Sequence, residues 1–344
     1  MIPITNFSPD EIESLFTSWQ EGLTRARKVS KAIFQLQPRH FDEMMEVSKR
    51  IKNRLREDYY LPNLHFQKKQ VSSDGTIKFL FKLQDENLIE SVLIPDVGRK
   101  KGKRTLCLST QVGCAMGCKF CLTGVSGLKR NLETWEIIEQ YREIARQSDQ
   151  PITHLVFMGM GEPLHNYKNL LKAIQIFSSV YGANISQRKI TVSTSGMTPQ
   201  LVRLAKETNV LLAVTLSAAS NSIRSQLMPI NKKYPLEELI AALKKIPLQK
   251  RKRIFIEYVL LKDINDHIKD AEALVKSLRD IPCKVNLIPF NEIPGFPYKQ
   301  PSKEKVFSFL RSLRSKGLST SIRTQRGQDI LAACGQLSNQ IRVL

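Results

Sequence analysis

Short runs of apolar, β-branched residues alternate with longer segments of helical periodicity over most of the chain after residue 104. This alternation is typical of repeated βα units. Six such units in succession favour an incomplete parallel (βα)6 barrel over an open doubly wound sheet, but periodicity alone does not separate the two. The predicted strands are Thr105–Ser109, Thr153–Phe157, Lys189–Ser193, Leu211–Leu216, Ile254–Val259, Lys284–Ile288 and, later, Ser319–Arg323.

The residues before this region follow two other patterns. Ser8–Glu11 combines a capping serine, a proline suited to the first helical position and the glutamate of a capping box, and helical spacing follows it. Alternation in Lys78–Phe81 and Ser91–Ile94 then predicts antiparallel strands. The expected α/β architecture therefore has a small helical N-terminal domain over residues 1–60, a strand-rich connector over 61–103 and the barrel domain over 104–344.

The charge of the chain points to a polyanionic partner. The 344 residues include 53 Lys and Arg against 32 Asp and Glu, which gives a formal net charge of +21. Nucleic acid is the commonest polyanion that such a protein meets. Two dense basic runs, at residues 99–104 and 250–253, are explained equally well as solvated turns. Solvated turns do not explain the net charge of +21 over the whole chain. We therefore expect RNA or DNA as the partner.

The sequence also predicts a compartment. No window approaches 18 uncharged apolar residues, which excludes a membrane span, and the first residues carry acids rather than a basic and apolar leader. We therefore expect a cytoplasmic protein. In that reducing compartment, six cysteines are better suited to metal binding or catalysis than to structural disulfides.

The strongest local signal is a group of three thiols on a glycine-containing loop after the first barrel strand: Cys114, Cys118 and Cys121. Three thiolates can hold three irons of a 4Fe-4S cluster, which leaves the fourth iron open to another ligand. The alternative is a zinc site, which would need a fourth Cys or His nearby. The five histidines of the chain form no matched pair, so the cluster is the preferred interpretation.

Two further strand ends carry polar groups. Gly159–Pro163 is a glycine turn with a carboxylate, Glu162, which can accept a hydrogen bond from a ligand's ammonium group. Ser193 ends the next strand and can bind a ribose or a carboxylate. Each of these features is ordinary when it is taken alone.

The cysteine spacing, with Phe120 before the third cysteine, resembles the motif of the radical S-adenosylmethionine superfamily. The resemblance implies that the open iron binds the amino and carboxylate groups of S-adenosylmethionine. One electron, from a donor such as flavodoxin or ferredoxin, would then cleave this cofactor to a 5′-deoxyadenosyl radical. The Gly159–Pro163 turn resembles the superfamily's motif for the amino group.

Five segments narrow the resemblance to the RlmN and Cfr family of RNA adenine-carbon methyltransferases. They occur in family order between about residues 90 and 340, and the helical N-terminus also fits that family. Chance does not explain so many colinear matches. The segments are Cys107–Cys114, Gly159–Pro163, Leu227–Asn231, Asn286–Asn291, and Arg326–Ile330 with Ala333–Leu337.

The family resemblance gives three residues catalytic roles. Composition alone would predict that Cys107 and Cys334 are structural thiols and that Glu90 is an exposed strand residue. The resemblance implies that one S-adenosylmethionine methylates Cys334, and that a second supplies the radical which activates this methyl group to attack adenine. Cys107 then attacks Cys334, forming a transient disulfide, while Glu90 accepts the proton from the ring carbon.

The same matching assigns residues to cofactor binding. One strand departs from the family pattern, because Ser217 stands where the family commonly has histidine, which puts that contact in doubt. The residues that the resemblance assigns to S-adenosylmethionine are Gly161, Glu162, Ser193, Thr215, Leu216, Ser217 and Asn291.

We therefore expect a monomeric enzyme that methylates an adenine carbon in structured RNA, ribosomal or transfer. Carbon 2 is preferred over carbon 8, because Gln111–Cys114 and the longer N-terminus are more similar to RlmN than to Cfr. Two interpretations from other classes stay open. One is a radical enzyme that acts on a protein or small metabolite, and the other is a metal-stabilised RNA-binding protein without catalysis.

Overall fold

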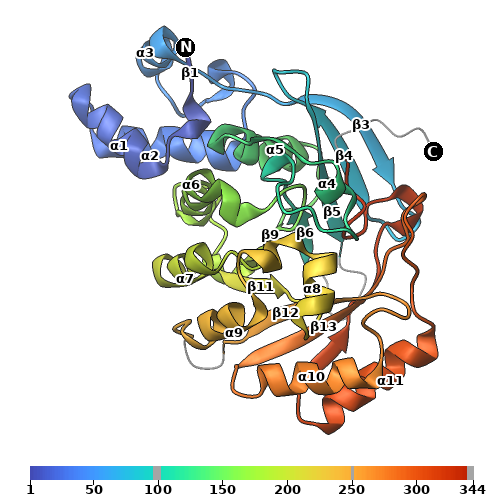
Figure 1. The fold of residues 1–344 in the computed structure, drawn as a ribbon. Helices are drawn as coiled ribbons and strands as arrows, with labels where there is room; N and C mark the ends of the chain where they lie inside the picture. The colour runs from blue at the N-terminus through green and yellow to red at the C-terminus, as the bar shows by residue number, and fades with distance from the viewer. Residues whose placement is uncertain (96–101, 249–251, 339–344) are drawn as a thin grey trace.

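The computed structural model describes residues 1–95, 102–248 and 252–338. Seven parallel strands follow one another across one sheet (Figure 1), and each overlaps a strand that the apolar runs predict. Most branched side chains of these runs are buried, whereas Val156 and Val259 are partly exposed where they line cavities. The strands are β6 (Arg104–Cys107), β9 (His154–Phe157), β10 (Ile190–Thr194), β11 (Leu211–Thr215), β12 (Ile254–Leu260), β13 (Cys283–Pro289) and β14 (Thr320–Ile322).

The predicted connector strands extend this sheet. β3 (His65–Val71), β4 (Ile77–Lys82) and β5 (Leu88–Pro95) form an antiparallel meander, and β5 pairs antiparallel with β6. The complete order is β14-β13-β12-β11-β10-β9-β6-β5-β4-β3. Each parallel strand neighbours the next one along the chain, without the reversal of a doubly wound sheet, and β14 and β3 stand at the two ends of the order. The described strands therefore confirm the incomplete barrel.

Amphipathic helices cover the outer side of the parallel strands (Figure 1). The helices after the first strand are α4 (Leu122–Val125), α5 (Thr134–Arg146), α6 (Tyr167–Ser178), α7 (Thr198–Glu207), α8 (Asn221–Leu227), α9 (Leu236–Lys244), α10 (Ile268–Leu278) and α11 (Lys303–Ser315). Helices α7 and α9, for example, bury an apolar stripe (Leu201 and Leu204, Leu239 and Leu243) and present charged residues to solvent, whereas α5 is buried from Thr134 to Ile144.

The N-terminal region is helical, as its spacing predicts. It contains α1 (Pro9–Ser18), α2 (Leu23–Lys31) and α3 (Lys49–Asp58), together with the short parallel pair β1 (Ile2–Pro3) and β2 (Tyr59–Tyr60). The predicted capping box is present, since the Ser8 amide donates to Glu11 Oε2 at 2.7 Å and the Glu11 amide donates to Ser8 Oγ at 3.3 Å.

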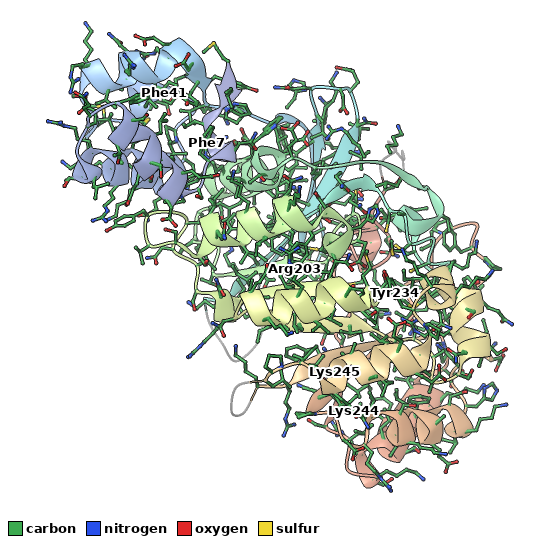
Figure 2. All side chains as sticks on the ribbon, turned by 60° about the vertical axis from the view of Figure 1, so that its left-hand side comes forward. Phe7, Phe41, Arg203, Tyr234, Lys244 and Lys245 are labelled. Carbon is green, nitrogen blue, oxygen red and sulfur yellow. The ribbon has the colours of Figure 1, made fainter. Side chains whose placement is uncertain are left out.

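A buried arginine joins this helical region to the barrel. Arg142 on α5 has no exposed surface, and its Nε donates to the carbonyl of Ile33 at 3.1 Å. Its Nη2 donates to the carbonyl of Pro38 at 2.5 Å, while Glu139 on the same helix balances its charge. Phe7 and Phe41 lie on this N-terminal unit in Figure 2, and the Phe7 ring meets Tyr59 edge-on at 5.4 Å.

The basic runs are described only in part. Arg104 pairs with Asp149 at 2.6 Å, and Lys252 donates to the carbonyl of Asn209 at 3.2 Å, so both side chains also serve local contacts. Other cations, such as Lys244 and Lys245, lie exposed at the end of α9 (Figure 2). Lys103 and Arg253 are exposed, while the other members of the runs, Arg99, Lys100, Lys101, Lys250 and Arg251, lie outside the described residues. Among the described helices, none is long and apolar enough to cross a membrane.

Candidate active site

The three clustered cysteines lie on a loop that leaves the carboxyl end of β6. A small hairpin of β7 (Gln111–Gly113) and β8 (Leu128–Asn131) closes the base of this loop, which sequence patterning does not predict. Gly113 has φ +77°, and a Cβ there would lie 1.8 Å from the carbonyl oxygen of Gly127. Cys114, Cys118 and Cys121 all line one cavity of about 170 Å³ above the strand ends.

The donor set of this cavity fits an iron–sulfur cluster better than a zinc ion. Burial raises the pKa of Cys118 and Cys121 and raises that of Cys114 to about 12, so the thiolates need a cationic partner. Tetrahedral zinc would hold its sulfur ligands about 3.8 Å apart. In the described part of the chain, the sulfurs of Cys114, Cys118 and Cys121 do not all lie within 4.8 Å of one another. The wider spacing suits thiolates on separate irons.

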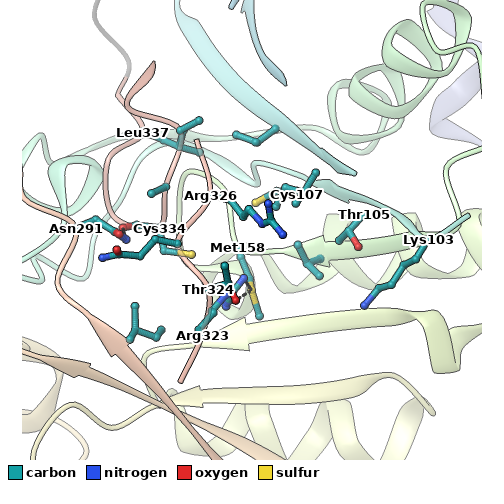
Figure 3. Close-up of a pocket in the computed structure, with 17 residues that line it drawn as sticks. Lys103, Thr105, Cys107, Met158, Asn291, Arg323, Thr324, Arg326, Cys334 and Leu337 are labelled. Carbon is teal, nitrogen blue, oxygen red and sulfur yellow. Dashed lines mark hydrogen bonds between the residues drawn. The ribbon is translucent and has the colours of Figure 1, made fainter. Parts of the chain in front are cut away.

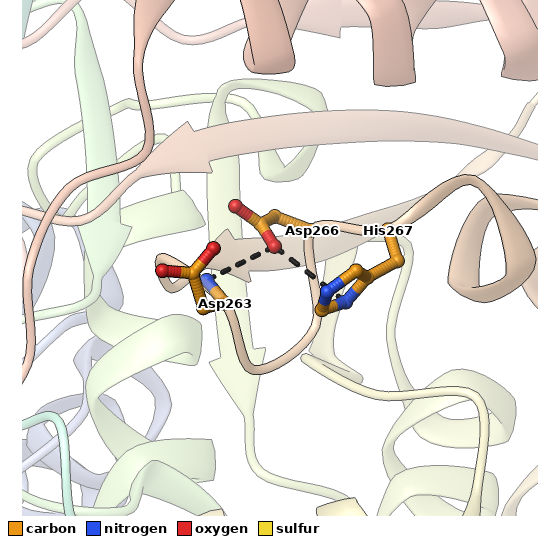
Figure 4. A group of neighbouring side chains, drawn as sticks. All are labelled: Asp263, Asp266 and His267. Atoms are coloured by element: carbon orange, nitrogen blue, oxygen red, sulfur yellow. Dashed lines mark hydrogen bonds and ion pairs between the residues drawn. The ribbon is translucent and has the colours of Figure 1, made fainter.

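Among the described residues, Asp263, Asp266 and His267 form a group whose possible metal-ligand atoms all lie within 4.8 Å of one another (Figure 4). It does not line the cysteine cavity. The Lys305 ammonium already lies 2.6 Å from Asp263 Oδ1 and 3.5 Å from Asp266 Oδ2. Because a cation of the chain itself faces these carboxylates, the group is explained as a link between the start of α10 and α11.

The glycine turn after β9 lies against the cysteine cavity. Gly161 has φ +102°, and a Cβ there would lie 2.6 Å from Gln111 Cβ, so only glycine fits. Glu162 Oε2 accepts hydrogen bonds from the amide and the hydroxyl of Ser195, both at 2.8 Å. Burial raises the pKa of Glu162. A buried carboxylate at this cavity is suited to bind an ammonium group.

The other residues assigned to cofactor binding divide into two groups. Ser193, Thr215 and Asn291 line the same cavity, whereas Leu216 and Ser217 are fully buried and do not line it. Ser217 Oγ instead accepts from the amide of Val259 at 3.3 Å, so its side chain points to β12. The serine at the family's histidine position is therefore turned away from this cavity.

A buried arginine that the sequence reasoning missed holds two strand ends together. Arg224 on α8 donates to the carbonyl of Ser195 at 2.7 Å and to that of Leu216 at 3.2 Å. Its Nη1 donates to Asn231 Oδ1 at 2.8 Å. Burial lowers the pKa of Arg224 to about 10. The sequence held one signal for this arginine: Asn231, in the Leu227–Asn231 segment, has a side-chain amide for which no partner is obvious from the sequence.

Figure 3 shows a second cavity, of about 340 Å³, which shares lining residues with the first. Cys107 and Cys334 both line it, although 226 residues of sequence lie between them. Cys334 lines the cysteine cavity as well, together with Met158 and Arg323. All six cysteines of the chain are free thiols. The structure thus brings Cys334 to the boundary between the cluster loop and Cys107.

The C-terminal segment that carries Cys334 is fixed to the cluster loop. Asn291 Nδ2 donates to the Cys334 carbonyl at 2.9 Å. The Leu122 amide donates to the Gly335 carbonyl, and Thr123 Oγ1 donates to the Leu337 carbonyl, both at 2.7 Å. These bonds set the Cys334 backbone against the loop that would hold the cluster.

The positive charge of Arg323 interacts with two thiols, those of Cys107 and Cys334. Burial and, to a smaller extent, the nearby Cys334 raise the pKa of Cys107 to about 12, while Arg323 opposes the rise. In turn, Cys334 raises the pKa of Arg323, and Glu257 lies 3.7 Å from its guanidinium. The sequence predicts a strand that ends at Arg323, but it assigns this arginine no role. A cation at the carboxyl end of a barrel strand was the signal that could have identified it.

Glu90 lies on β5, buried behind the Cys334 segment, and lines neither cavity. Its Oε1 is 3.0 Å from Lys78 Nζ, and its Oε2 accepts from the Ser338 amide at 2.8 Å. Burial raises the pKa of Glu90, while Lys78 and the Ser338 amide oppose the rise. The expectation of an exposed strand glutamate is wrong, because the antiparallel extension packs under the C-terminal segment.

Comparisons with known proteins bear on this arrangement. The radical SAM superfamily model matches residues 108–275, and the model of the ribosomal RNA large subunit methyltransferase N-terminal domain matches residues 2–61. A dual-specificity RNA methyltransferase RlmN from Geotalea uraniireducens is 44% identical over 99% of this chain and 97% of its own length. The RlmN of Pelobacter propionicus is 46% identical over 98% of this chain and 96% of its own.

The whole fold is similar to that of a solved structure. The crystal structure of a radical SAM methyltransferase from Sphaerobacter thermophilus superposes with a TM-score of 0.91 at 37% identity, and it covers 99% of this chain and 100% of its own. These matches confirm the resemblance that the colinear motifs indicate. The chain belongs to the RlmN family of radical SAM methyltransferases.

Proposed function

We propose that this chain methylates carbon 2 of adenine in ribosomal and transfer RNA. The observation that carries the proposal is the position of Cys334 at the boundary of two cavities. The cluster cysteines and the Glu162 turn line one cavity, and Cys107 lines the other. A thiol in this position can accept a methyl group on one side and deliver it to a base on the other.

The family implies a 4Fe-4S cluster and S-adenosylmethionine as cofactors, and the cysteine cavity fits both. Cys114, Cys118 and Cys121 would hold three irons of the cluster. Glu162 would accept from the cofactor's ammonium group, while other polar groups of the cavity, among them Asn291, bind its remaining parts. When they are bound, these groups supply a 5′-deoxyadenosyl radical.

The residues of the chain then divide the remaining work, with two molecules of S-adenosylmethionine consumed in each turnover. Cys334 accepts a methyl group by nucleophilic displacement, and Arg323 lines both cavities together with it. After the activated methyl carbon has joined adenine, the adduct would return one electron to the oxidised cluster, and Glu90 would remove the ring proton. Cys107 then attacks the Cys334 sulfur: the S–S bond of a disulfide forms and the S–C bond breaks with its electron pair on the carbon. That carbon takes a proton to complete the methyl group of the released base.

The partner of this chemistry is structured RNA, which the net charge of +21 would attract. We assign residues 1–60 to an accessory RNA-binding domain, 61–103 to the connector and 104–344 to the barrel with its catalytic C-terminal segment. The enzyme would work as a cytoplasmic monomer that takes electrons from flavodoxin or ferredoxin.

Nucleoside mass spectrometry tests the proposal. Ribosomal and transfer RNA from cells without this gene are incubated with the anaerobically reconstituted protein, a reductant and methyl-labelled S-adenosylmethionine. We expect label in 2-methyladenosine. Label in 8-methyladenosine would move the activity to carbon 8. Cleavage of S-adenosylmethionine without any labelled adenosine would overturn the RNA assignment and favour another substrate for the radical.

A further inference from the structure

The Cys334 segment is held by the connector as well as by the barrel. Asp329 accepts from the Ser72 hydroxyl at 2.6 Å and from the Ser73 amide at 3.0 Å. The Gly327 amide donates to Asp74 Oδ2 at 3.0 Å. The turn between β3 and β4 therefore anchors the start of the segment, although more than 250 residues of sequence separate Ser72 from Asp329. The connector is thus part of the site and more than a spacer.

Lys78 on β4 lies at the centre of this contact. Its side chain is only 9% exposed, and its ammonium lies 3.0 Å from Glu90 Oε1. The same ammonium donates to the carbonyl of Leu331, within the Cys334 segment, at 3.2 Å. A buried cation is costly unless acceptors surround it. One ammonium therefore links the proposed base to the segment that carries the proposed methyl carrier.

The strand register explains this geometry. Leu80 lies opposite Glu90, and Lys78 lies opposite Val92, so Lys78 and Glu90 are diagonal neighbours on one face of the sheet. Val92 also pairs with Cys107 on the next strand and lines the larger cavity. The pair of charges therefore stands immediately beside the wall of the cavity where the base would react.

We propose that Lys78 is a positioning residue: it fixes Glu90 through Oε1, so that Oε2 is the oxygen that takes the proton from the adenine carbon. This inference rests on the proposed function. In the step, the ring C–H bond breaks, its electron pair stays in the ring, and an O–H bond forms at Oε2. In the present arrangement the Ser338 amide holds this oxygen, and Ser338 must yield it when the base enters.

Lys78→Met tests the inference, because methionine keeps an unbranched side chain only one atom shorter and removes the charge. Three quantities are measured: methylation of Cys334 by intact-protein mass spectrometry, covalent protein–RNA adduct on denaturing gels, and methyladenosine formed per enzyme. We expect normal methylation of Cys334, accumulation of the adduct and at least tenfold slower product formation. Lys78→Arg should restore part of the rate, since it keeps the cation.

Lys82→Met is the matched control on the same strand, because Lys82 pairs with the exposed Glu86 and not with Glu90. It should behave like the wild type. If Lys78→Met folds poorly, the double variant Lys78→Met/Glu90→Gln removes both buried charges. It should then accumulate as much adduct as Glu90→Gln alone, since the two residues act as one unit.

The outcomes separate the inference from the function on which it rests. Wild-type rates and no adduct in Lys78→Met would overturn the role of Lys78. Loss of Cys334 methylation in a folded Lys78→Met would also overturn it, because the lysine would then only anchor the segment through Leu331. If the wild-type protein itself forms neither adduct nor methyladenosine, the proposed function fails instead.

Discussion

Cys107 is a thiol whose burial opposes its proposed reaction. With a pKa of about 12, only about one molecule in 10⁵ carries the thiolate at pH 7. Since the thiolate is the nucleophile, release of the methylated base should accelerate about tenfold for each pH unit between pH 7 and 9. Single-turnover release of RNA from the pre-formed adduct measures this rate. A rate that is constant over this range would show that Arg323 keeps Cys107 ionised.

Cys107→Ala should leave the RNA bound covalently to the protein. Release needs the second thiol, whereas methylation of Cys334 and joining to adenine do not. Cys283→Ala is the control, because Cys283 is also buried but lines neither cavity. Denaturing gels with labelled RNA should show the adduct for the first variant and free RNA for the second. Ordinary turnover by Cys107→Ala would make this cysteine a structural residue.

At the scale of the element, the turn after β9 depends on the absence of one Cβ. Gly161→Ala should bring the new methyl group against Gln111 at 2.6 Å and also strain a backbone with φ +102°. Gly295→Ala imposes similar strain at φ +82°, but nothing lies within 4 Å of the added atom. The control should lose only about 1 kcal/mol of unfolding free energy. Gly161→Ala should lose more, together with affinity for S-adenosylmethionine, as calorimetry and equilibrium dialysis would show.

The elements themselves could be predicted largely from sequence, because period and branched-residue content follow from local packing. All seven predicted parallel strands and the capping box at Ser8 are present. What pattern reasoning could not reach is tertiary. Lys78 has the sequence position of a solvent-facing strand residue, and only the docking of a segment about 250 positions later buries it. For the same reason Ser217 was assigned to the cofactor, while its side chain bonds a neighbouring strand.

Across the whole molecule, positive charge is distributed unevenly. Residues 1–61 contain ten Lys and Arg and nine Asp and Glu, so nearly all of the net charge of +21 belongs to the connector and the barrel. RNA binding should therefore depend strongly on salt, and affinity should fall by at least tenfold between about 50 and 200 mM KCl. Filter binding measures this dependence, and S-adenosylmethionine cleavage serves as the salt-insensitive control. Affinity that is unchanged by salt would contradict binding through phosphates.

The segment around Cys334 is a partition with a chamber on either side. Because hydrogen bonds fix its backbone to the cluster loop, the sulfur can change chambers only by turning about its own side-chain bond. Such rotations take picoseconds to nanoseconds, whereas hinge motions of domains take microseconds or longer. Under the proposed function, a pivot of this one side chain would bring the methyl carbon from one chamber to the other, and neither cofactor nor RNA would have to travel.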